Sequence, residues 1–86
     1  MINQIKQTIQ KTLPDAHIIV ADPYNDGEHF EAIVVCKTFE SMSLVNQHKI
    51  VMNALKEKFE SSVHALALKT FTPQKWENAK HNYKGA

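Results

Sequence analysis

Three histidines, at positions 29, 48 and 64, are the side chains of this 86-residue chain best suited to coordinate a metal. Imidazole is the commonest protein metal ligand, and it binds a metal in its neutral form. His29 and His64 each open an apolar run, and His48 lies between them in a segment with helical spacing. The single cysteine, Cys36, cannot complete a cysteine-based site, and two imidazoles cannot enclose an ion. We therefore predict half of a metal site, which a second molecule would complete.

The first third of the chain predicts a helix, a strand and a tight loop. Isoleucine and leucine recur at steps of three and four residues over 2–13, which is typical of a short amphipathic helix. Pro14 ends this helix, because the residue before a proline is pushed out of the helical region. The apolar run 18–21 predicts a β-strand. Residues 22–27 are dense in turn formers and predict a hairpin loop.

The rest of the chain predicts a strand over 29–36, a long helix after Ser43, a strand over 63–71 and a helix after Thr72–Pro73. The long helix carries one apolar stripe, made of Leu44, His48, Val51, Leu55 and Phe59. The order is α-β-β-α-β-α. It indicates an α+β fold with a mixed three-stranded sheet and helices over one face.

This topology predicts which histidines meet. The first two strands, joined by a short loop, should pair antiparallel, whereas the helix between the second and third strands allows a parallel crossover. Parallel neighbours begin at the same end of a sheet, so we expect His29 and His64 to lie close together. His48 is expected to pack in its helix or to support the site. The loop before His29 also offers Asp22, Asp26 and Glu28, so an acid beside His29 remains an alternative second ligand.

Composition indicates one domain, over residues 1–80, with a loose tail at 81–86. No apolar run is long enough to span a bilayer, and the start lacks the apolar core of a secretory signal, so we expect a cytoplasmic protein. Cys36 is expected to be a small core residue. With two glycines the chain offers no phosphate-binding loop, and no nucleophile–base arrangement is evident, so we expect a protein that is not an enzyme.

Charge is divided unevenly along the chain. Residues 1–35 carry two lysines against five acidic residues, and residues 36–86 carry eight lysines against four. The basic second half could contact nucleic acid, with Lys69, Lys75 and Lys80 as candidates. All ten basic residues are lysine, however, so the chain lacks the guanidinium fork suited to bidentate contacts with guanine or phosphate.

Three blocks of the sequence together resemble the BolA-like protein family. They are residues 64–76 (HALALKTFTPQKW), 27–30 (GEHF) and 44–51 (LVNQHKIV), and the resemblance extends over about residues 2–80. Within the family, the chain is most similar to the short bacterial YrbA/IbaG-type branch. The resemblance implies a fold similar to the type II KH domain, with the element order predicted above.

The resemblance also implies a function. Family members bind monothiol glutaredoxins, and the pair shares a bridged [2Fe–2S] cluster. Glutaredoxin and glutathione supply thiolates, and the BolA-like partner supplies two ligands, here His64 and His29. Mixed histidine and thiolate ligation raises the reduction potential of such a cluster relative to all-thiolate ligation. We thus expect an adaptor in cluster trafficking or in iron and redox sensing, which by itself is a monomer or a weak homodimer without a cofactor.

The alternative implied by the family is a DNA-binding transcriptional regulator of the stress response that uses the KH-like surface. Two departures weaken this alternative. The arginine-rich block that often surrounds the helix histidine is Gln47-His48-Lys49 here, and the KH glycine loop is absent. A third departure is Ser41, where the family usually has glycine.

Overall fold

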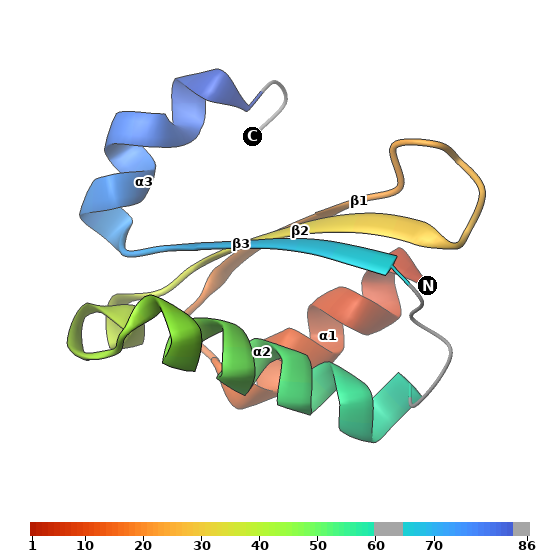
Figure 1. Ribbon diagram of the computed structural model, residues 1–86, viewed down its shortest axis with the longest axis horizontal. Coiled ribbons are helices and arrows are strands. Elements are labelled where there is room, and N and C mark those ends of the chain that lie inside the picture. The colour runs from red at the N-terminus through yellow and green to blue at the C-terminus, as the bar shows by residue number, and fades with distance from the viewer. Residues whose placement is uncertain (60–64, 84–86) are drawn as a thin grey trace.

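The structure is a computed structural model that describes residues 1–59 and 65–83. The elements follow the predicted order (Figure 1): α1 (Ile2–Thr12), β1 (His17–Ala21), β2 (His29–Val35), the 3-10 turn η1 (Lys37–Ser41), α2 (Leu44–Phe59), β3 (Ala65–Phe71), α3 (Pro73–Ala79) and the 3-10 turn η2 (Lys80–Asn82). Among the helices of the described ranges, none has the length and apolarity to cross a membrane.

The three strands form one mixed sheet in the order β1-β2-β3. β1 and β2 pair antiparallel, with His17 opposite Val35, and β2 and β3 pair parallel, with His29 opposite Ala65. Figure 1 shows α1 and α2 together on one face of the sheet and α3 on the other. The predicted α+β class and mixed sheet are confirmed. Helical cover of one face holds for α1 and α2, whereas α3 departs from it.

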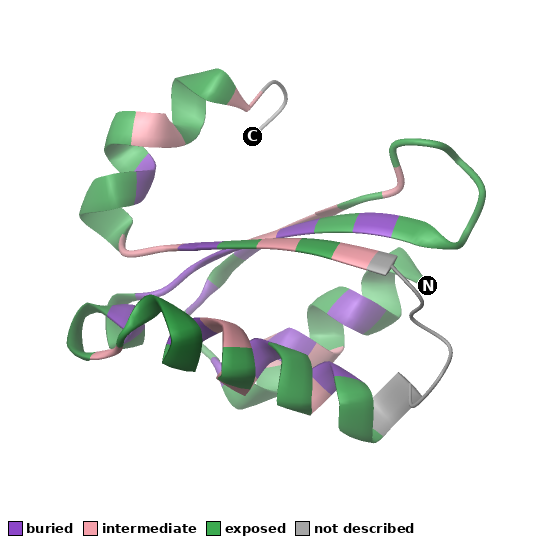
Figure 2. Cartoon of the chain, viewed as in Figure 1, coloured by how far each residue is buried: buried purple, intermediate pink, exposed green. Residues whose placement is uncertain are grey.

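The core lies between the sheet and the α1–α2 pair. Alternate residues of β2, namely Phe30, Ala32 and Val34, are buried toward these helices, as the period of two predicts (Figure 2). Ile5 and Ile9 from α1 and Val51 and Leu55 from α2 meet them there, each at most 2% exposed. One apolar stripe on each helix therefore suffices to close the core.

The element boundaries follow from local chemistry. α1 ends at Thr12, and Leu13, directly before Pro14, is no longer helical. The Ser43 hydroxyl accepts a hydrogen bond from the amide of Asn46, and the Thr72 hydroxyl accepts one from the amide of Lys75, so both act as N-caps. At Ser41 the chain makes a 3-10 turn with no positive φ, so this turn does not require glycine.

α2 differs from the sequence prediction on one side. Val51 and Leu55 are buried as expected, but Leu44 is 62% exposed and His48 is only half-buried. Among the described side chains of α2, the buried polar one is that of Gln47, one position before His48. The periodicity of a helix identifies an apolar face, but not whether a neighbouring element covers its whole length. Here Leu44 and Val45, on the outer side of the first turn, stay exposed.

α3 rests on the open face of the sheet through an aromatic cluster. The Trp76 ring packs against Phe71 at a centroid distance of 5.3 Å and against Tyr83 at 5.7 Å. The His17 ring lies 6.5 Å from Trp76 on the same side. Because Tyr83 belongs to this cluster, the packed part of the chain extends past the boundary at residue 80 that composition indicated. Residues 84–86 lie outside the described ranges.

A buried hydrogen-bond network ties α2 to β3. The side-chain amide of Gln47 donates to the carbonyl oxygens of Phe39 and Met42, at 3.2 and 3.1 Å. Its side-chain oxygen accepts a 2.7 Å bond from the hydroxyl of Thr70. Gln47 and Thr70 are each 8% exposed. One side chain therefore joins η1, the start of α2 and the end of β3.

We predict that Gln47→Ala destabilises the protein by about 1–3 kcal/mol, because it removes the side-chain partner of the Thr70 hydroxyl and of the Met42 carbonyl, while the Phe39 carbonyl keeps its bond from the amide of Met42. Urea denaturation followed by circular dichroism measures the effect. Gln7→Ala on the exposed side of α1 is the matched control, and it should change the free energy of unfolding by less than about 0.5 kcal/mol. Equal effects of the two substitutions would contradict the role given to Gln47.

Candidate metal centre

The loop between β1 and β2 is organised by two aspartates. The Asp22 carboxylate accepts hydrogen bonds from the amides of Asp26 and Gly27, at 3.3 and 3.0 Å. Asn25 and Gly27 both have positive φ, at 53° and 69°, a conformation that asparagine tolerates and glycine adopts without strain. These bonds close the loop and bring Asp26 back over the start of β2.

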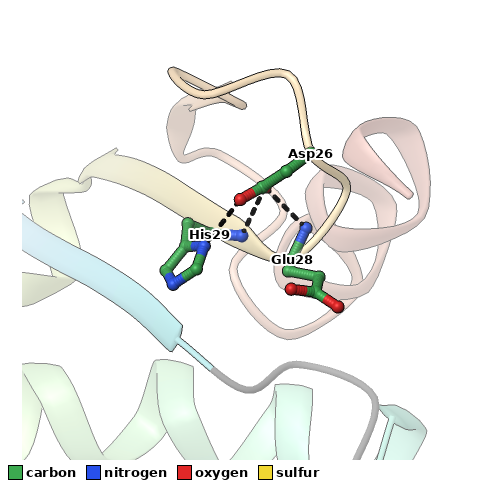
Figure 3. A group of neighbouring side chains, drawn as sticks. All are labelled: Asp26, Glu28 and His29. Atoms are coloured by element: carbon green, nitrogen blue, oxygen red, sulfur yellow. Dashed lines mark hydrogen bonds and ion pairs between the residues drawn. The ribbon is translucent and has the colours of Figure 1, made fainter.

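Asp26 holds the first residue of β2 through both backbone and side chain. One carboxylate oxygen accepts hydrogen bonds from the amides of Glu28 and His29, at 2.9 and 3.0 Å. The other oxygen lies 2.7 Å from Nδ1 of His29 (Figure 3). The Tyr24 ring meets the imidazole edge-on at a centroid distance of 5.7 Å. The His29 side chain, although 52% exposed, is therefore held in one orientation.

The contacts shift the acidity of both groups. The hydrogen bond from the imidazole to Asp26, and then the attraction of that carboxylate, raise the pKa of His29 above its ordinary value of 6.5. Hydrogen bonds from the amides of His29 and Glu28, and then from the imidazole, hold the pKa of Asp26 far below its ordinary value of 3.8. Asp26 is thus ionised at neutral pH and can only accept hydrogen bonds.

An ionised carboxylate at Nδ1 has a direct consequence for ligation. Nδ1 must carry the proton of this bond, so the neutral imidazole presents the lone pair of Nε2. Figure 3 shows the second ring nitrogen on the side of the ring away from Asp26. A carboxylate that orients a histidine through its other nitrogen is the usual arrangement behind a metal-binding imidazole. Asp26, Glu28 and His29 can also bring one ligand atom each within 4.8 Å of one another.

The parallel register puts His29 at the end of the sheet where β3 begins. Its partner in the register is Ala65, the residue that follows His64 in the sequence. His64 itself lies outside the described residues, so its predicted proximity to His29 stays a prediction. His48 is not brought to this end. It lines a depression with Leu68 and Phe71, roughly 10–20 Å from Ala65 at about 3.3 Å per strand residue.

The remaining candidates occupy other places. Cys36 is 1% exposed and follows the last residue of β2, at the opposite end of that strand from His29, as its predicted core role requires. Lys69 and Lys75 are exposed, and Lys80 is paired with Glu77 at 2.9 Å. Sequence reasoning noted Asp26 only as a loop neighbour of His29. The available signal was its position three residues before a histidine that opens a strand.

We expect the pKa of His29 to lie above 6.5 and to fall toward that value in Asp26→Asn, which removes the ionised acceptor. An NMR titration of the imidazole signals measures both values. Asp15→Asn, an exposed acid near the other end of the sheet, is the control and should leave the His29 pKa unchanged. A His29 pKa that is the same in all three proteins would contradict the pairing.

The same pair predicts the sign of a stability effect. Because the folded pKa of His29 is raised, its contribution is present below about pH 6.5 and is lost as the pH rises through the raised value. Because the folded pKa of Asp26 is lowered, its contribution is present above about pH 3.8 and is lost as the pH falls through the lowered value. Urea midpoints of the natural protein and Asp26→Asn should therefore differ most between these limits.

Comparison with known proteins shows the family of the chain. The model of the family described as "BolA-like protein" matches residues 5–75. The chain is 34% identical over 55 residues to the DNA-binding transcriptional regulator BolA of Escherichia coli, covering 64% of this chain and 52% of that protein. It is 41% identical over 56 residues to BolA-like protein 1 of Mus musculus, covering 65% and 41%. The match thus spans about half the length of these two relatives or less.

A solved structure agrees over a longer range. A BolA homologue from Coxiella burnetii superposes with a TM-score of 0.74 at 41% identity, covering 90% of this chain and 96% of that one. The fold, the motif blocks and the family match agree on the identity that the sequence resemblance implied. The chain belongs to the BolA-like protein family.

Proposed function

We propose that this protein is a non-enzymatic adaptor that binds a monothiol glutaredoxin and shares a bridged [2Fe–2S] cluster with it, with His29 and His64 as its ligands. The observation that carries the proposal is the His29–Asp26 pair. The pair fixes an exposed imidazole whose Nε2 is available for ligation. This imidazole lies at the end of the sheet where β3 begins, and His64 directly precedes β3 in the sequence. The cluster is cargo received from the partner, and mixed ligation would suit it to transfer or sensing.

The donor set of the chain explains why a partner is needed. Its one thiol, Cys36, is buried and lies at the far end of β2, so this chain has no thiolate to offer at the His29 end. Imidazoles alone leave the irons short of sulfur ligands. Glutaredoxin and glutathione would supply those thiolates, and the roles of this chain are to present Nε2 and to keep the proton on Nδ1.

The test is to mix the protein with [2Fe–2S]-loaded monothiol glutaredoxin and glutathione and to record visible circular dichroism. We expect a new spectrum that His64→Ala and His29→Ala each abolish, because each removes a ligand. Asp26→Asn should weaken cluster binding by about 10–100-fold while keeping the same spectrum, since it weakens the acceptor at Nδ1 of His29 and leaves both ligands in place.

His81→Ala, on the exposed η2 turn, is the matched control and should behave as the natural protein. An unchanged spectrum on mixing would contradict the adaptor role. A new spectrum that persists in His64→Ala or His29→Ala would contradict the assignment of that ligand. Each variant is first compared with the natural protein by far-ultraviolet circular dichroism, so that loss of folding is not counted as loss of a ligand.

The second candidate is DNA binding, favoured by the name of the E. coli relative and by the exposed side chains of Lys69 and Lys75. Binding through lysine and phosphate contacts should weaken steeply with salt, and each lost contact should reduce the slope by about one. Titration of duplex DNA with the natural protein and with Lys69→Gln/Lys75→Gln at several salt concentrations measures this. Equal slopes for the two proteins would exclude these lysines as the contact.

A further inference from the structure

β3 is an edge strand of the sheet. It pairs with β2 on one side only, and no other described strand pairs with its outer edge. The backbone N–H and C=O groups along such an edge can pair with another extended chain. Natural proteins often protect an edge strand with a covering element. Here the neighbouring element, α2, lies below this edge and leaves its outward side uncovered among the described residues (Figure 1).

Two adjoining depressions lie on this side of the molecule, one between α2 and the end of β3 and the other on α2 alone. One, of about 330 Å³, lies between the start of α2 and the end of β3, and Leu44, His48, Leu68 and Phe71 are among its lining residues. The other, of about 400 Å³, continues along α2 beside Val45, Lys49 and Met52 and shares Leu44 and His48 with the first. We call the two together the α2–β3 groove.

The α2–β3 groove has an apolar floor that the core does not use. Leu44 is 62% exposed, Val45 63% and Met52 41%, and all three lie on α2. They account for half of the large exposed apolar side chains of the described residues. The groove is also preformed, because the Gln47–Thr70 bond ties the start of α2 to the end of β3. A partner would therefore not need to order this surface before binding.

The strand alternation defines what would fit. In β3, Leu66, Leu68 and Thr70 face α2, whereas Lys69 faces the open side of the sheet, paired in register with Ile33. A strand added beside β3 would alternate in the same way. Its side chains on one face would lie over Leu44, His48 and Met52, and those on the other face would lie next to Lys69.

The charges that line the α2–β3 groove indicate which kind of molecule would bind there. The charged residues that line the α2–β3 groove are Lys49 and Lys69, and none of the described lining residues is acidic. A second copy of this chain would bring the same lysines and repel them. Nucleic acid could use the lysines but would leave the apolar floor unmatched. An extended peptide with alternating apolar and acidic residues can pair with the backbone of the β3 edge, cover the apolar side chains of α2 and neutralise the lysine charge.

We propose that the α2–β3 groove is a docking site for an extended segment of a partner protein, which adds to the sheet as a fourth strand beside β3. The apolar residues of that segment cover the exposed side chains of α2, and its acidic residues, on the other face, lie next to Lys69. The groove lies along Leu68–Phe71, away from the end of the sheet that holds His29. Docking there and ligation by His29 can therefore occur at the same time, and neither proposal depends on the other.

The test uses a library of random ten-residue peptides displayed on phage and selected on the full chain. We expect enrichment of peptides that alternate apolar residues with aspartate or glutamate. Binding of an enriched peptide, measured by fluorescence anisotropy, should weaken at least about tenfold for Leu44→Glu/Met52→Glu and several-fold for Lys69→Glu. Ile2→Glu and Lys11→Glu, which make the same changes on exposed α1 positions, are the matched controls and should bind normally.

Because the substituted residues are exposed, the variants should fold, and thermal unfolding followed by circular dichroism verifies this. Amide hydrogen exchange then locates the peptide, and alternate amides of β3 should gain protection, since alternate N–H groups point to the free edge. Selection of lysine-rich peptides, equal selection by the double variant, or protection away from β3 would each overturn the proposal.

The competing occupants have their own outcomes. Sedimentation of the chain alone tests for self-association, and a dimer that Leu44→Glu/Met52→Glu dissociates would show that a second copy fills the α2–β3 groove. An oligothymidylate that displaces the enriched peptide, and whose binding Lys69→Glu weakens, would assign the groove to nucleic acid. Either outcome would overturn the proposal. A monomer whose bound peptide is not displaced would support it.

Discussion

The parallel pairing of β2 with β3 is the constraint on which the rest of this structure depends. The α2 crossover returns the chain to the end of the sheet where β2 begins, so that His29 and Ala65 become partners. An antiparallel arrangement would put the start of β3 beside Val35 instead. The same crossover leaves β3 at the edge with α2 beneath it. The candidate metal centre, at the start of β2, and the α2–β3 groove, at the end of β3, thus both follow from one choice of strand direction and lie at opposite ends of the sheet.

Each of these two surfaces is held by a short polar network on a rigid element. At the start of β2, Asp26 holds the backbone and the imidazole of His29 together. At the end of β3, Gln47 satisfies two carbonyl groups and the Thr70 hydroxyl, in a position where an unsatisfied group would be costly. The first network is exposed, and it is made of two titratable side chains, so its contribution to stability depends on pH. The second network is buried and neutral, so it ties α2 to β3 independently of the protonation of Asp26 and His29.

The positions of the thiol, the oriented imidazole and the exposed apolar side chains agree with the proposed adaptor role. Its one thiol is inside the core, its oriented imidazole is outside, and large apolar side chains remain exposed on α2. A protein that completed its own metal site would need more ligands at the His29 end. Burial of Leu44 and Val45 would stabilise the folded state of a protein that has no partner. Both features agree with the proposed role, in which other molecules supply the remaining ligands and cover the exposed apolar side chains. Family membership agrees with such a role without specifying the partner.

The order of the elements, their caps and most of the core could be predicted from the sequence, because apolar periodicity and capping side chains act over a few neighbouring residues. The length of the segment between the second and third strands allowed a parallel crossover, and the structure shows that pairing. Only the tertiary structure decided that Leu44 stays exposed, that α3 packs on the opposite face through Trp76, and that Asp26, not Glu28, orients His29. These depend on which surfaces meet after folding, and on the backbone path of a loop, so no local pattern specifies them.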